Sequence, residues 1–395
     1  MSSSAPRRLA LLGCTGSIGR STLDVLTDLP GQFQLVALSA GRNVDLMCEQ
    51  ALAWRPEVLA MADEPSAAAV RQRLAAAGFK PRVLAGPAGL QAVAAECGAH
   101  TVVAATVGIA ALPAIAAALA TGCRLALANK EALVAAGPLL LAIAAASGAE
   151  ILPVDSEHSA IHQCLRGGAP VEVARLILTA SGGPFRGFSP AQLASVTPAA
   201  ALRHPTWNMG TRISLDSATL MNKGFEILEA CSLFALPEDR VDVLVHPQSI
   251  VHSLVEFRDG SVLAQLGTVD MRTPIQYALT YPSRCPSRRK QLKLEEIGRL
   301  DFELPDDNAF PCLALARQAG KAGGGAGAIL NAADEIALEE FAAGRIGFPA
   351  IASVVEETLQ RLTARPIDSI GAVLELDRQA REVAREAATA RLVGR

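Results

Sequence analysis

The first 150 residues alternate short, continuous apolar runs with longer segments of helical pattern. This alternation constrains the fold strongly, because neighbouring parallel strands need helical crossovers that cover both faces of one sheet. The runs are continuous rather than alternating, so the strands should be buried on both faces. The sequence therefore predicts an α/β domain with a parallel sheet over residues 1–150. Its expected strands are 9–12, 34–38, 58–61, 83–85, 101–105 and 125–128.

The rest of the chain predicts three further parts. A second α/β domain, 151–285, should contain strands 151–154, 176–179 and 241–245, a helix over 217–234, and a hairpin that turns at Asp259 and Gly260. Within it, residues 184–212 are rich in Pro, Gly and Thr and too long for an ordinary connector, which indicates a mobile functional loop. Residues 286–307 are expected to be a linker. The purely helical pattern of 308–395 predicts a C-terminal α-helical bundle of three or four helices.

Composition narrows the class of protein. A chain of 395 residues favours two or three domains, and its 50% hydrophobic residues provide for a sizeable core. The 36 Lys and Arg residues against 39 Asp and Glu leave no basic excess that would point to nucleic acid as the main partner. The eight cysteines form no C-x-x-C pair, and the N-terminus lacks the apolar stretch of a signal peptide, so we expect a cytoplasmic protein with reduced thiols.

One uncharged stretch, residues 97–123, is long enough to span a bilayer. It is mostly alanine, which contributes little to insertion, and Gly108 and Pro113 interrupt it. We expect it to divide into a strand, a loop and a helix over 113–120 rather than to cross a membrane.

A glycine-rich turn, GCTGSIG at residues 13–19, follows the first expected strand and opens a helix. In this place the pattern is typical of dinucleotide sites, where glycines admit the pyrophosphate and the helix N-terminus faces its charge. A plain tight turn is the alternative. The domain is therefore predicted to be Rossmann-like.

The end of the second strand discriminates between cofactors. NAD sites usually place Asp or Glu there to bind the ribose 2′-hydroxyl, whereas this chain has Gly41, Arg42 and Asn43. A cation at Arg42 suits a 2′-phosphate, so we predict NADPH. An ordinary surface arginine is the alternative interpretation.

Asp155 and Glu157 lie two residues apart at a predicted strand end, and period two would put both carboxylates on one side. Adjacent like charges favour a cation between them, and oxygen ligands favour Mg²⁺ or Mn²⁺. A structural ion pair with arginine is the alternative. Glu226 is a candidate third ligand, with Glu229 as its rival, although a solvated helix acid is the more ordinary interpretation of Glu229.

Ser217, Asn222 and Glu226 do not share one face of a regular helix. Either the helix start is irregular or the ligand wraps around its end. Asn222 and Glu226 are one turn apart and do share a face.

Only six basic residues are lysines, and two of these, Lys130 and Lys223, lie in polar clusters. Lys130 follows a strand of the parallel sheet, where such sheets bind ligands. Lys223, with Ser181, Ser217 and Asn222, offers donors for an anionic group such as phosphate; local capping is the commoner role of any single Ser or Asn.

His158 adjoins the carboxylates and is a candidate for a supporting or core histidine. His204 and Trp207 fall in the long loop, where an indole indicates either a lid that excludes water or an anchor packed into the body. His162, His246 and His252 are expected to have core or surface roles.

Taken in order, these motifs resemble those of the 1-deoxy-D-xylulose 5-phosphate reductoisomerase family over nearly the whole chain. The motifs are GCTGSIG at 13–19, ANKE at 128–131, PVDSEH at 153–158, SGGPF at 181–185, HPTWNMG at 204–210, SATLMNKG at 217–224 and HPQS at 246–249. None of these positions departs from the family pattern.

The resemblance implies NADPH, Mg²⁺ or Mn²⁺, a small phosphorylated sugar as substrate and a homodimer, with residues 151–285 as the catalytic and dimerisation domain. Exposed edge strands among 241–267 are the expected interface. It assigns metal binding to Asp155, Glu157 and Glu226, and catalysis to these three and Lys130. It places substrate at Lys130, Ser156, Glu157, Ser181, His204, Trp207, Ser217, Asn222, Lys223 and Glu226. It places cofactor at Thr15, Gly16, Ser17, Ile18, Gly41, Arg42, Asn43, Asn129, Glu131 and Gly210.

The implied reaction is a rearrangement of 1-deoxy-D-xylulose 5-phosphate, followed by reduction to 2-C-methyl-D-erythritol 4-phosphate for non-mevalonate isoprenoid biosynthesis. Two rivals remain. A simple NADP-dependent dehydrogenase of sugar phosphates would not need three metal carboxylates, and an NADP-binding regulatory protein would leave those acids and Lys130 without a role.

Overall fold

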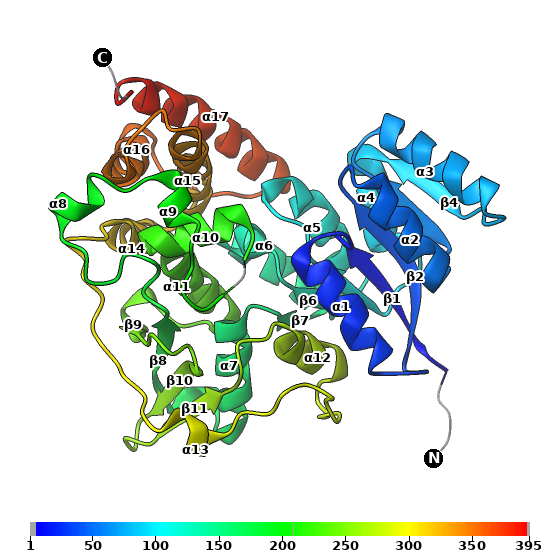
Figure 1. Ribbon diagram of the computed structural model, residues 1–395, viewed down its shortest axis with the longest axis horizontal. Helices are drawn as coiled ribbons and strands as arrows, with labels where there is room; N and C mark the ends of the chain where they lie inside the picture. The colour runs from blue at the N-terminus through cyan, green and yellow to red at the C-terminus, as the bar shows by residue number, and fades with distance from the viewer. Residues whose placement is uncertain (1–4, 208, 393–395) are drawn as a thin grey trace. The chain divides into compact units, whose positions relative to one another are not determined.

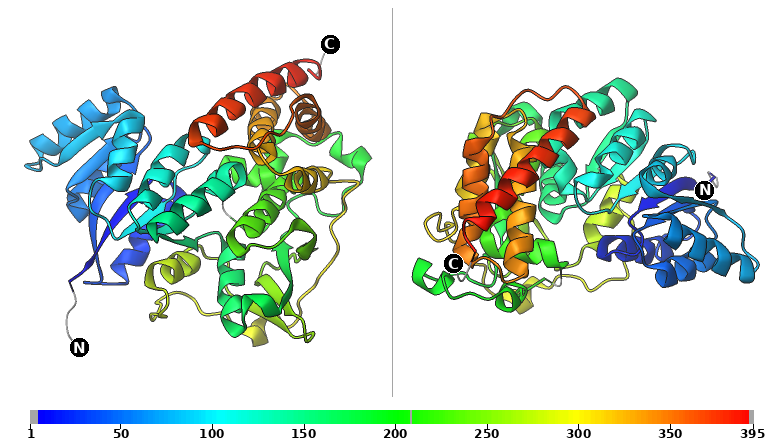
Figure 2. Two further views of the ribbon diagram at one scale, coloured as in Figure 1. Left: turned by 180° about the vertical axis from the view of Figure 1, so that it is seen from behind. Right: turned by 90° about the horizontal axis from the view of Figure 1, so that it is seen from above.

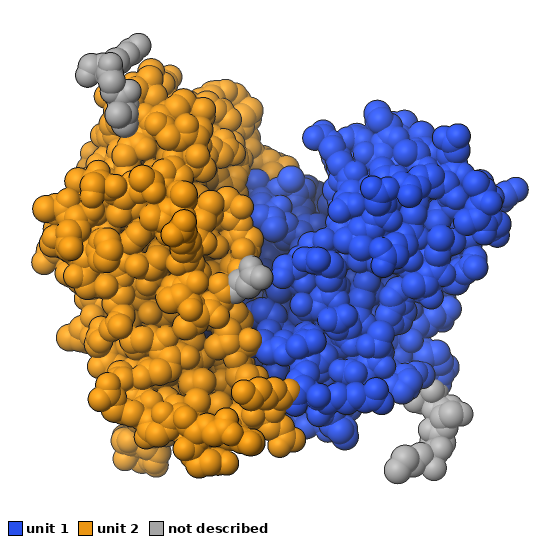
Figure 3. All heavy atoms as spheres, in the orientation of Figure 1, with its two compact units in different colours: residues 1–132, 140–159, 270–289 blue, residues 133–139, 160–269, 290–395 orange. Residues whose placement is uncertain are grey.

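The computed structural model describes residues 5–207 and 209–392, and the contacts within the chain divide it into two compact units (Figure 3). Unit 1 comprises residues 1–132, 140–159 and 270–289, and unit 2 comprises 133–139, 160–269 and 290–395. This division differs from the expected boundary near residue 150, because the strand expected at 151–154 pairs with the first sheet. Residues 270–289 also belong to unit 1.

Unit 1 is built on a seven-stranded sheet in the order β4-β3-β2-β1-β5-β6-β7, in which every neighbouring pair is parallel (Figure 1). This confirms the predicted parallel sheet, and each expected strand is present to within a few residues. The central strands are buried on both faces, as their continuous apolar runs indicate. The strands are β1 (Arg7–Leu12), β2 (Phe33–Ala40), β3 (Val58–Met61), β4 (Arg82–Ala85), β5 (Thr101–Ala104), β6 (Arg124–Leu127) and β7 (Glu150–Pro153).

Helices connect and flank these strands, as the alternating pattern predicts. The helices that lie wholly in unit 1 are α1 (Ser17–Thr27), α2 (Val44–Trp54), α3 (Glu64–Ala76), α4 (Gly86–Ala95), α5 (Leu112–Ala120) and α12 (Arg272–Thr280). Apolar residues of four of these helices, α1, α2, α3 and α12, form one buried core with the sheet. Two more helices begin in unit 1, namely α6 (Lys130–Ser147) and α7 (Ser156–Cys164).

The strand order reverses between β1 and β5. From β1 the chain passes outward through β2, β3 and β4, and it then returns to place β5 on the other side of β1. Open α/β sheets bind ligands at such a switch point, beyond the carboxyl ends of the strands. The glycine-rich turn at 13–19 follows β1 and therefore lies where a dinucleotide site is expected.

Unit 2 contains a four-stranded mixed sheet in the order β11-β10-β8-β9, with β8 and β9 parallel and the other pairs antiparallel. The hairpin of β10 and β11 turns at the expected Asp259 and Gly260. Strand β11 is an edge strand, and its Val262 and Leu263 are 47% and 40% exposed. The strands are β8 (Val173–Ala180), β9 (Val241–Val245), β10 (Val251–Phe257) and β11 (Val262–Leu266).

The C-terminal helices of unit 2 pack together as the predicted bundle (Figure 2). Apolar residues from these helices, from the sheet of unit 2 and from the two helices after the long loop form one continuous core. The helices of this core are α10 (Thr211–Thr219), α11 (Met221–Phe234), α14 (Cys312–Ala322), α15 (Ala326–Ala342), α16 (Phe348–Arg361) and α17 (Ile370–Thr389). The short helix α13 (Leu294–Ile297) of unit 2 has no buried residue.

The segment 184–212 is more ordered than a loop prediction implies. It contains two short helices, α8 (Pro190–Leu193) and α9 (Pro198–Ala201), and α10 has already begun at Thr211. Ser189 and Thr197 cap the two short helices, whose buried Leu193 and Ala201 join the core of unit 2. The segment expected to be a mobile functional loop therefore contains two short helices that are anchored in the core.

Among the described residues, α6 is the one helix long and apolar enough to cross a membrane by length and composition. Half of it is buried, and its backbone leaves helical geometry at Ala136. Core helices of globular proteins pass the same test. The uncharged stretch 97–123 forms β5, a short helical turn and α5, as expected.

Candidate active site

The turn at 13–19 has a backbone that only glycine can form. Gly13 has φ +82°, and a Cβ there would lie 2.5 Å from the carbonyl oxygen of Ala105. A Cβ on Gly19 would lie 2.3 Å from the carbonyl oxygen of Gly13. Gly16 is the N-cap residue of α1, and none of the described side chains caps the helix. The first N–H groups of α1 therefore suit an anion such as a pyrophosphate.

At the end of β2, Arg42 extends into solvent with its side chain 81% exposed, and its Nε lies 2.6 Å from Oδ2 of Asp63. The hydrogen bond from Arg42 lowers the pKa of Asp63 to about 2. Asn43 caps α2 by accepting from the N–H of Leu46 at 3.1 Å, which is the local role that such a residue commonly has. Asp63 lies just beyond β3 and was not anticipated, because only the pairing of β3 with β2 brings it to Arg42.

Lys130 and Asp155 meet at the carboxyl ends of β6 and β7. Lys130 begins α6, and its Nζ lies 3.0 Å from Oδ2 of Asp155, with both side chains at most 15% exposed. Asn129 holds the start of α6 by accepting from the N–H of Ala132 at 2.9 Å. Its amide also donates to the carbonyl oxygen of Thr106 at 2.9 Å. Lys130 is thus held on a rigid, mostly buried platform.

Asp155 and Glu157 come together for a different reason than period two. Strand β7 ends at Pro153, and Glu157 lies in the first turn of α7. Oδ1 of Asp155 accepts from the N–H of Glu157 at 3.2 Å, and Ser156 donates to Oε2 of Glu157 at 2.5 Å. The strand-face argument is therefore wrong, whereas a strand-to-helix junction places the two acids close together. His158 is fully buried, with Nδ1 3.4 Å from Oδ1 of Asp155.

In unit 2, Ser181 follows β8 and reaches His204, with Oγ and Nε2 2.8 Å apart. Nδ1 of His204 accepts from the N–H groups of Thr206 and Trp207 at 3.2 and 2.9 Å. A neutral His204 therefore carries its proton on Nε2 and donates to Ser181. Burial lowers the pKa of His204, which favours this neutral form. The Trp207 ring lies 6.2 Å from that of His252.

The helix expected over 217–234 is in fact two helices. Leu220 adopts a left-handed conformation with φ +61° and separates α10, which carries Ser217, from α11. On α11, Asn222 donates to Oε1 of Glu226 at 2.6 Å, and Lys223 pairs with the other oxygen of Glu226. Of the two alternatives, the irregular helix start is thus the one observed. Because Ser217 and Asn222 lie on two different helices, the spacing of one regular helix does not apply to them.

Lys223 and Glu226 are 3% and 1% exposed. Glu229 is also buried, at 3%, so the interpretation of Glu229 as a solvated acid is wrong. Burial of charged side chains costs free energy unless they are paired or bind an ion, so this helix face is not ordinary solvated surface.

Gly183 brings the end of β8 against α10, a contact that sequence reasoning missed. Gly183 has φ +67°, and a Cβ there would lie 2.6 Å from the carbonyl oxygen of Ser217. The glycine pair after Ser181 therefore sets the distance between two predicted phosphate-binding serines. His246 has the expected core role, since it is fully buried and its ring stacks on Phe302.

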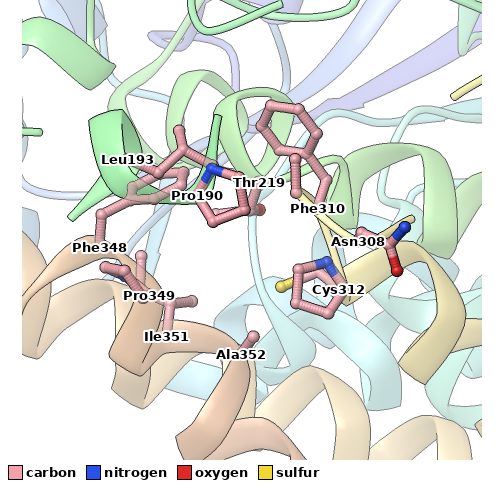
Figure 4. A pocket seen from close by; sticks show the side chains of 12 residues that line it. Pro190, Leu193, Thr219, Asn308, Phe310, Cys312, Phe348, Pro349, Ile351 and Ala352 are labelled. Carbon is pink, nitrogen blue, oxygen red and sulfur yellow. The ribbon is translucent and has the colours of Figure 1, made fainter. Parts of the chain in front are cut away.

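A cavity of about 120 Å³ lies elsewhere in unit 2 (Figure 4). It is bounded by side chains from α8, from the segment before α14 and from α16, together with Thr219 at the end of α10. No lysine or arginine is among the described residues that line it, so it does not suit a phosphate. Its walls are mostly apolar, as in Leu193, Phe310 and Phe348.

A parallel sheet with a glycine-built turn at its switch point, and the shielded pair of Lys130 and Asp155 beyond two other strand ends, is typical of a dinucleotide-dependent oxidoreductase of the α/β class. Comparison of the chain with known protein families narrows this class. The family model for 1-deoxy-D-xylulose 5-phosphate reductoisomerase matches residues 9–137, and the family models for C-terminal domains of the same enzyme match residues 151–234 and 266–383. The chain belongs to the 1-deoxy-D-xylulose 5-phosphate reductoisomerase family.

Individual relatives agree over nearly the full length. The reductoisomerase of Xanthomonas campestris pv. campestris (strain 8004) is 54% identical over 98% of both chains, and that of Burkholderia multivorans is 53% identical over 96% of both. The solved structure of the Zymomonas mobilis enzyme in complex with NADPH is 43% identical, with a TM-score of 0.91 over 97% of this chain and 99% of that one. A reductoisomerase structure with NADPH, fosmidomycin and magnesium is 41% identical, with a TM-score of 0.93 over 97% of this chain and 98% of that one.

Proposed function

We propose that this chain converts 1-deoxy-D-xylulose 5-phosphate to 2-C-methyl-D-erythritol 4-phosphate in isoprenoid biosynthesis, using NADPH and a divalent cation. The observation that carries the proposal is the 54% sequence identity, over 98% of both chains, to an enzyme named 1-deoxy-D-xylulose 5-phosphate reductoisomerase. The geometry supports it, because the predicted residues that lie within each unit form compact polar clusters on rigid elements. NADPH supplies the hydride, and Mg²⁺ or Mn²⁺ supplies Lewis acidity toward the oxygens of the substrate.

The nucleotide turn suits NADPH, since its backbone leaves no room for side chains at Gly13 and Gly19 and no described side chain caps α1. Arg42 is exposed enough to turn from Asp63 toward a 2′-phosphate. Asn43 and Asn129 both have capping roles, so each would hold the shape of the site through its side chain. The proposed cofactor contacts are Thr15, Gly16, Ser17, Ile18, Gly41, Arg42, Asn43, Asn129, Glu131 and Gly210.

Asp155, Glu157 and Glu226 are the proposed metal ligands. Their oxygen donors match the preference of Mg²⁺ and Mn²⁺. Within its own unit each of Asp155 and Glu226 is paired with a lysine, Lys130 and Lys223 respectively, which balances the charge of a buried carboxylate. The chemistry of the donor set therefore fits a divalent cation.

The other residues would bind and orient the substrate. Ser181, Ser217, Asn222 and Lys223 would hold the phosphate, whose binding energy helps to position the reacting end. Neutral His204 fixes the hydroxyl of Ser181 by donating to it, so that the hydroxyl hydrogen can point to a phosphate oxygen. Lys130 would hold a proton at Nζ beside developing negative charge on substrate oxygens. Ser156 would complete the substrate contacts beside Glu157.

Trp207 is proposed as the indole of a lid that excludes water from the substrate. Its backbone N–H is tied to His204, so movement of the lid and the state of His204 are linked. The enzyme is further proposed to be cytoplasmic and to form a homodimer through edge strand β11. The exposed Val262 and Leu263 support the choice of this edge.

By function, rather than by the compact units of the fold, we propose a nucleotide domain (1–150), a catalytic domain (151–285), a linker (286–307) and a helical domain (308–395).

The test of the proposal is oxidation of NADPH by the purified chain with 1-deoxy-D-xylulose 5-phosphate and Mn²⁺. We expect metal-dependent turnover and a branched product identified by NMR, which a simple dehydrogenase would not form. An NADP-binding regulatory protein would show no turnover at all.

Substitution at α11 tests the metal ligands. Glu226→Gln should abolish turnover and metal dependence while the Kd for NADPH stays near the parent value. Glu229→Gln, one turn along the same helix, should keep metal-dependent turnover. Loss of NADPH binding in Glu226→Gln, or loss of metal dependence in Glu229→Gln alone, would show that the third ligand is misassigned.

A further inference from the structure

A series of alternating charges in unit 2 connects α10 to two C-terminal helices. Arg212, the second residue of α10, pairs with Glu335 on α15 and donates to Oδ1 of Asn331 at 2.7 Å. Glu335 pairs a second time, with Arg381 on α17. Arg381 also donates to Oδ2 of Asp377 at 2.7 Å. Figure 1 shows α10, α15 and α17 in one region of this unit, and the contacts of α15 with both neighbours agree.

These pairs differ from ordinary surface salt bridges. The side chains of Arg212, Glu335 and Arg381 are only 18%, 14% and 20% exposed. Water screens exposed pairs and leaves them with little energy, whereas a shielded carboxylate between two guanidinium groups interacts strongly with both. Removing the charge of Glu335 would leave two cations close together with their shared partner gone.

A second acidic residue of α15 influences the same helix further along. Asp216 lies one turn after Arg212, with Oδ2 3.6 Å from Nε of Arg212. Asp334 on α15 is fully buried, and burial together with the neighbouring charge of Asp216 raises its pKa well above the ordinary value. The raised pKa favours the neutral form of Asp334, which reduces its repulsion with Asp216. Arg212 binds α15 through both Glu335 and Asn331, and these two contacts restrain the rotation of α10 about its own axis.

The rotation of α10 matters because of what the helix connects. It starts directly after the long loop, with Gly210 as its N-cap, and it carries Ser217 immediately after Asp216. The carbonyl oxygen of Ser217 faces Gly183, so the helix is positioned from one side by β8 and from the other by α15.

We propose that Arg212 and Glu335 are positioning residues for the reaction, through which the C-terminal helical bundle orients Ser217 toward the phosphate group of the substrate. The inference rests on the proposed phosphate-binding role of Ser217. It gives the bundle a function in substrate binding, although the sequence of that bundle contains no predicted site residue.

The experiment measures KM for the sugar phosphate and KM for NADPH separately, with inhibition by inorganic phosphate as an independent probe. Glu335→Gln keeps the shape of the side chain and removes the charge that both arginines share. We expect KM for the sugar phosphate and Ki for inorganic phosphate to rise together by about tenfold, the effect of one weakened charged hydrogen bond. KM for NADPH should stay within about twofold.

Three further variants guard against a folding defect. Arg381→Gln weakens the same series from its far end on α17 and should show the same selective rise, smaller in size. Arg212→Lys keeps the cation and should recover part of the affinity that Arg212→Gln loses. Arg378→Gln is the matched control, because Arg378 lies three residues before Arg381 and its side chain is 57% exposed, where it pairs with the exposed Glu375 and Glu382 of the same helix. It should leave both KM values unchanged.

The outcomes separate this inference from the proposed function. If Ser217→Ala leaves KM for the sugar phosphate unchanged, the role of Ser217 fails and the inference fails with it. If Ser217→Ala raises that KM but Glu335→Gln lowers only the melting temperature, or raises both KM values equally, the inference alone is overturned. If the inference is correct, Glu335→Gln raises KM for the sugar phosphate little further in the Ser217→Ala background, because both substitutions act on one contact. Fully additive effects of the two substitutions on that KM would overturn the inference.

Discussion

Replacing Gly183 by alanine tests whether the contact between β8 and α10 sets the geometry of the phosphate-binding residues. Two features oppose the added methyl group. The backbone has φ +67°, and the Cβ would lie 2.6 Å from the carbonyl oxygen of Ser217 and 3.2 Å from Cα of Ala218. Both opposing atoms are backbone, so no flexible side chain can move aside.

The size of the effect follows from these numbers. Since such atoms essentially never approach closer than 3.0 Å, Ser217 must retreat by about 0.4 Å. A 1 Å misplacement costs about 100-fold in catalytic efficiency, so a shift of about 0.4 Å should cost about sixfold, which we expect as a rise in KM for the sugar phosphate. The left-handed backbone costs about 1–2 kcal/mol for alanine and the overpacking about 1–3 kcal/mol, which lowers the free energy of unfolding by about 2–5 kcal/mol.

Gly187 provides the matched control. It lies in the same segment with φ +82°, but no described atom lies within 4 Å of its added Cβ. Gly187→Ala should lower the free energy of unfolding by about 1–2 kcal/mol and leave KM for the sugar phosphate unchanged. Steady-state kinetics and thermal unfolding of both variants provide the comparison. Equal KM values for the two variants would refute the reasoning, because backbone strain alone would then explain the effect of Gly183→Ala.

Three other predictions concern the cofactor, the loop and assembly. Arg42→Asp should raise KM for NADPH far more than KM for NADH, and an equal rise for both would contradict a contact with the 2′-phosphate. His204 has a lowered pKa, so the stability that its neutral form gives the loop should be constant above its ordinary value of 6.5 and be lost as the pH falls below it; proteolysis of the loop measures this, and a protection that is independent of pH in this range would contradict it. Val262→Glu should shift the chain from dimer to monomer in size-exclusion chromatography with light scattering, and an unchanged dimer would exclude edge strand β11 as the interface.

Much of unit 1 could be predicted from sequence because its signals are local. Each buried strand is a continuous apolar run, and the order of strands and helices nearly determines a parallel sheet. The same locality explains the error at Asp155 and Glu157. An alternating pattern was assumed to continue past the strand, but the Asp155 side chain accepts from the backbone of Glu157 and starts a helix there instead. The two acids are close together by either route, so the wrong strand geometry still predicted that they are neighbours.

The short helices of the long loop show a different limit. Ser189 followed by Pro190, and Thr197 followed by Pro198, are readable helix starts. Helices of one turn carry too few residues for a periodic pattern, so composition alone favoured an irregular loop. What stabilises them is the burial of Leu193 and Ala201 in the core of unit 2, which is a tertiary effect.

The contacts that position the proposed phosphate-binding residues join segments far apart in the chain, and one sequence alone does not predict them. Arg212 and Glu335 are 123 residues apart and look like ordinary helix surface charges in the sequence, yet they are shielded and paired in the fold. The residues that would touch the substrate are recognisable by their chemistry, since a phosphate needs donors and a cation needs carboxylates. Residues that only orient the substrate-binding residues have no such chemical signature, because many kinds of charged residue, or a glycine that permits a close contact, can orient a neighbour. Candidates for positioning residues are therefore found from shielded ion pairs and close backbone contacts beside the proposed site, as at Glu335 and Gly183.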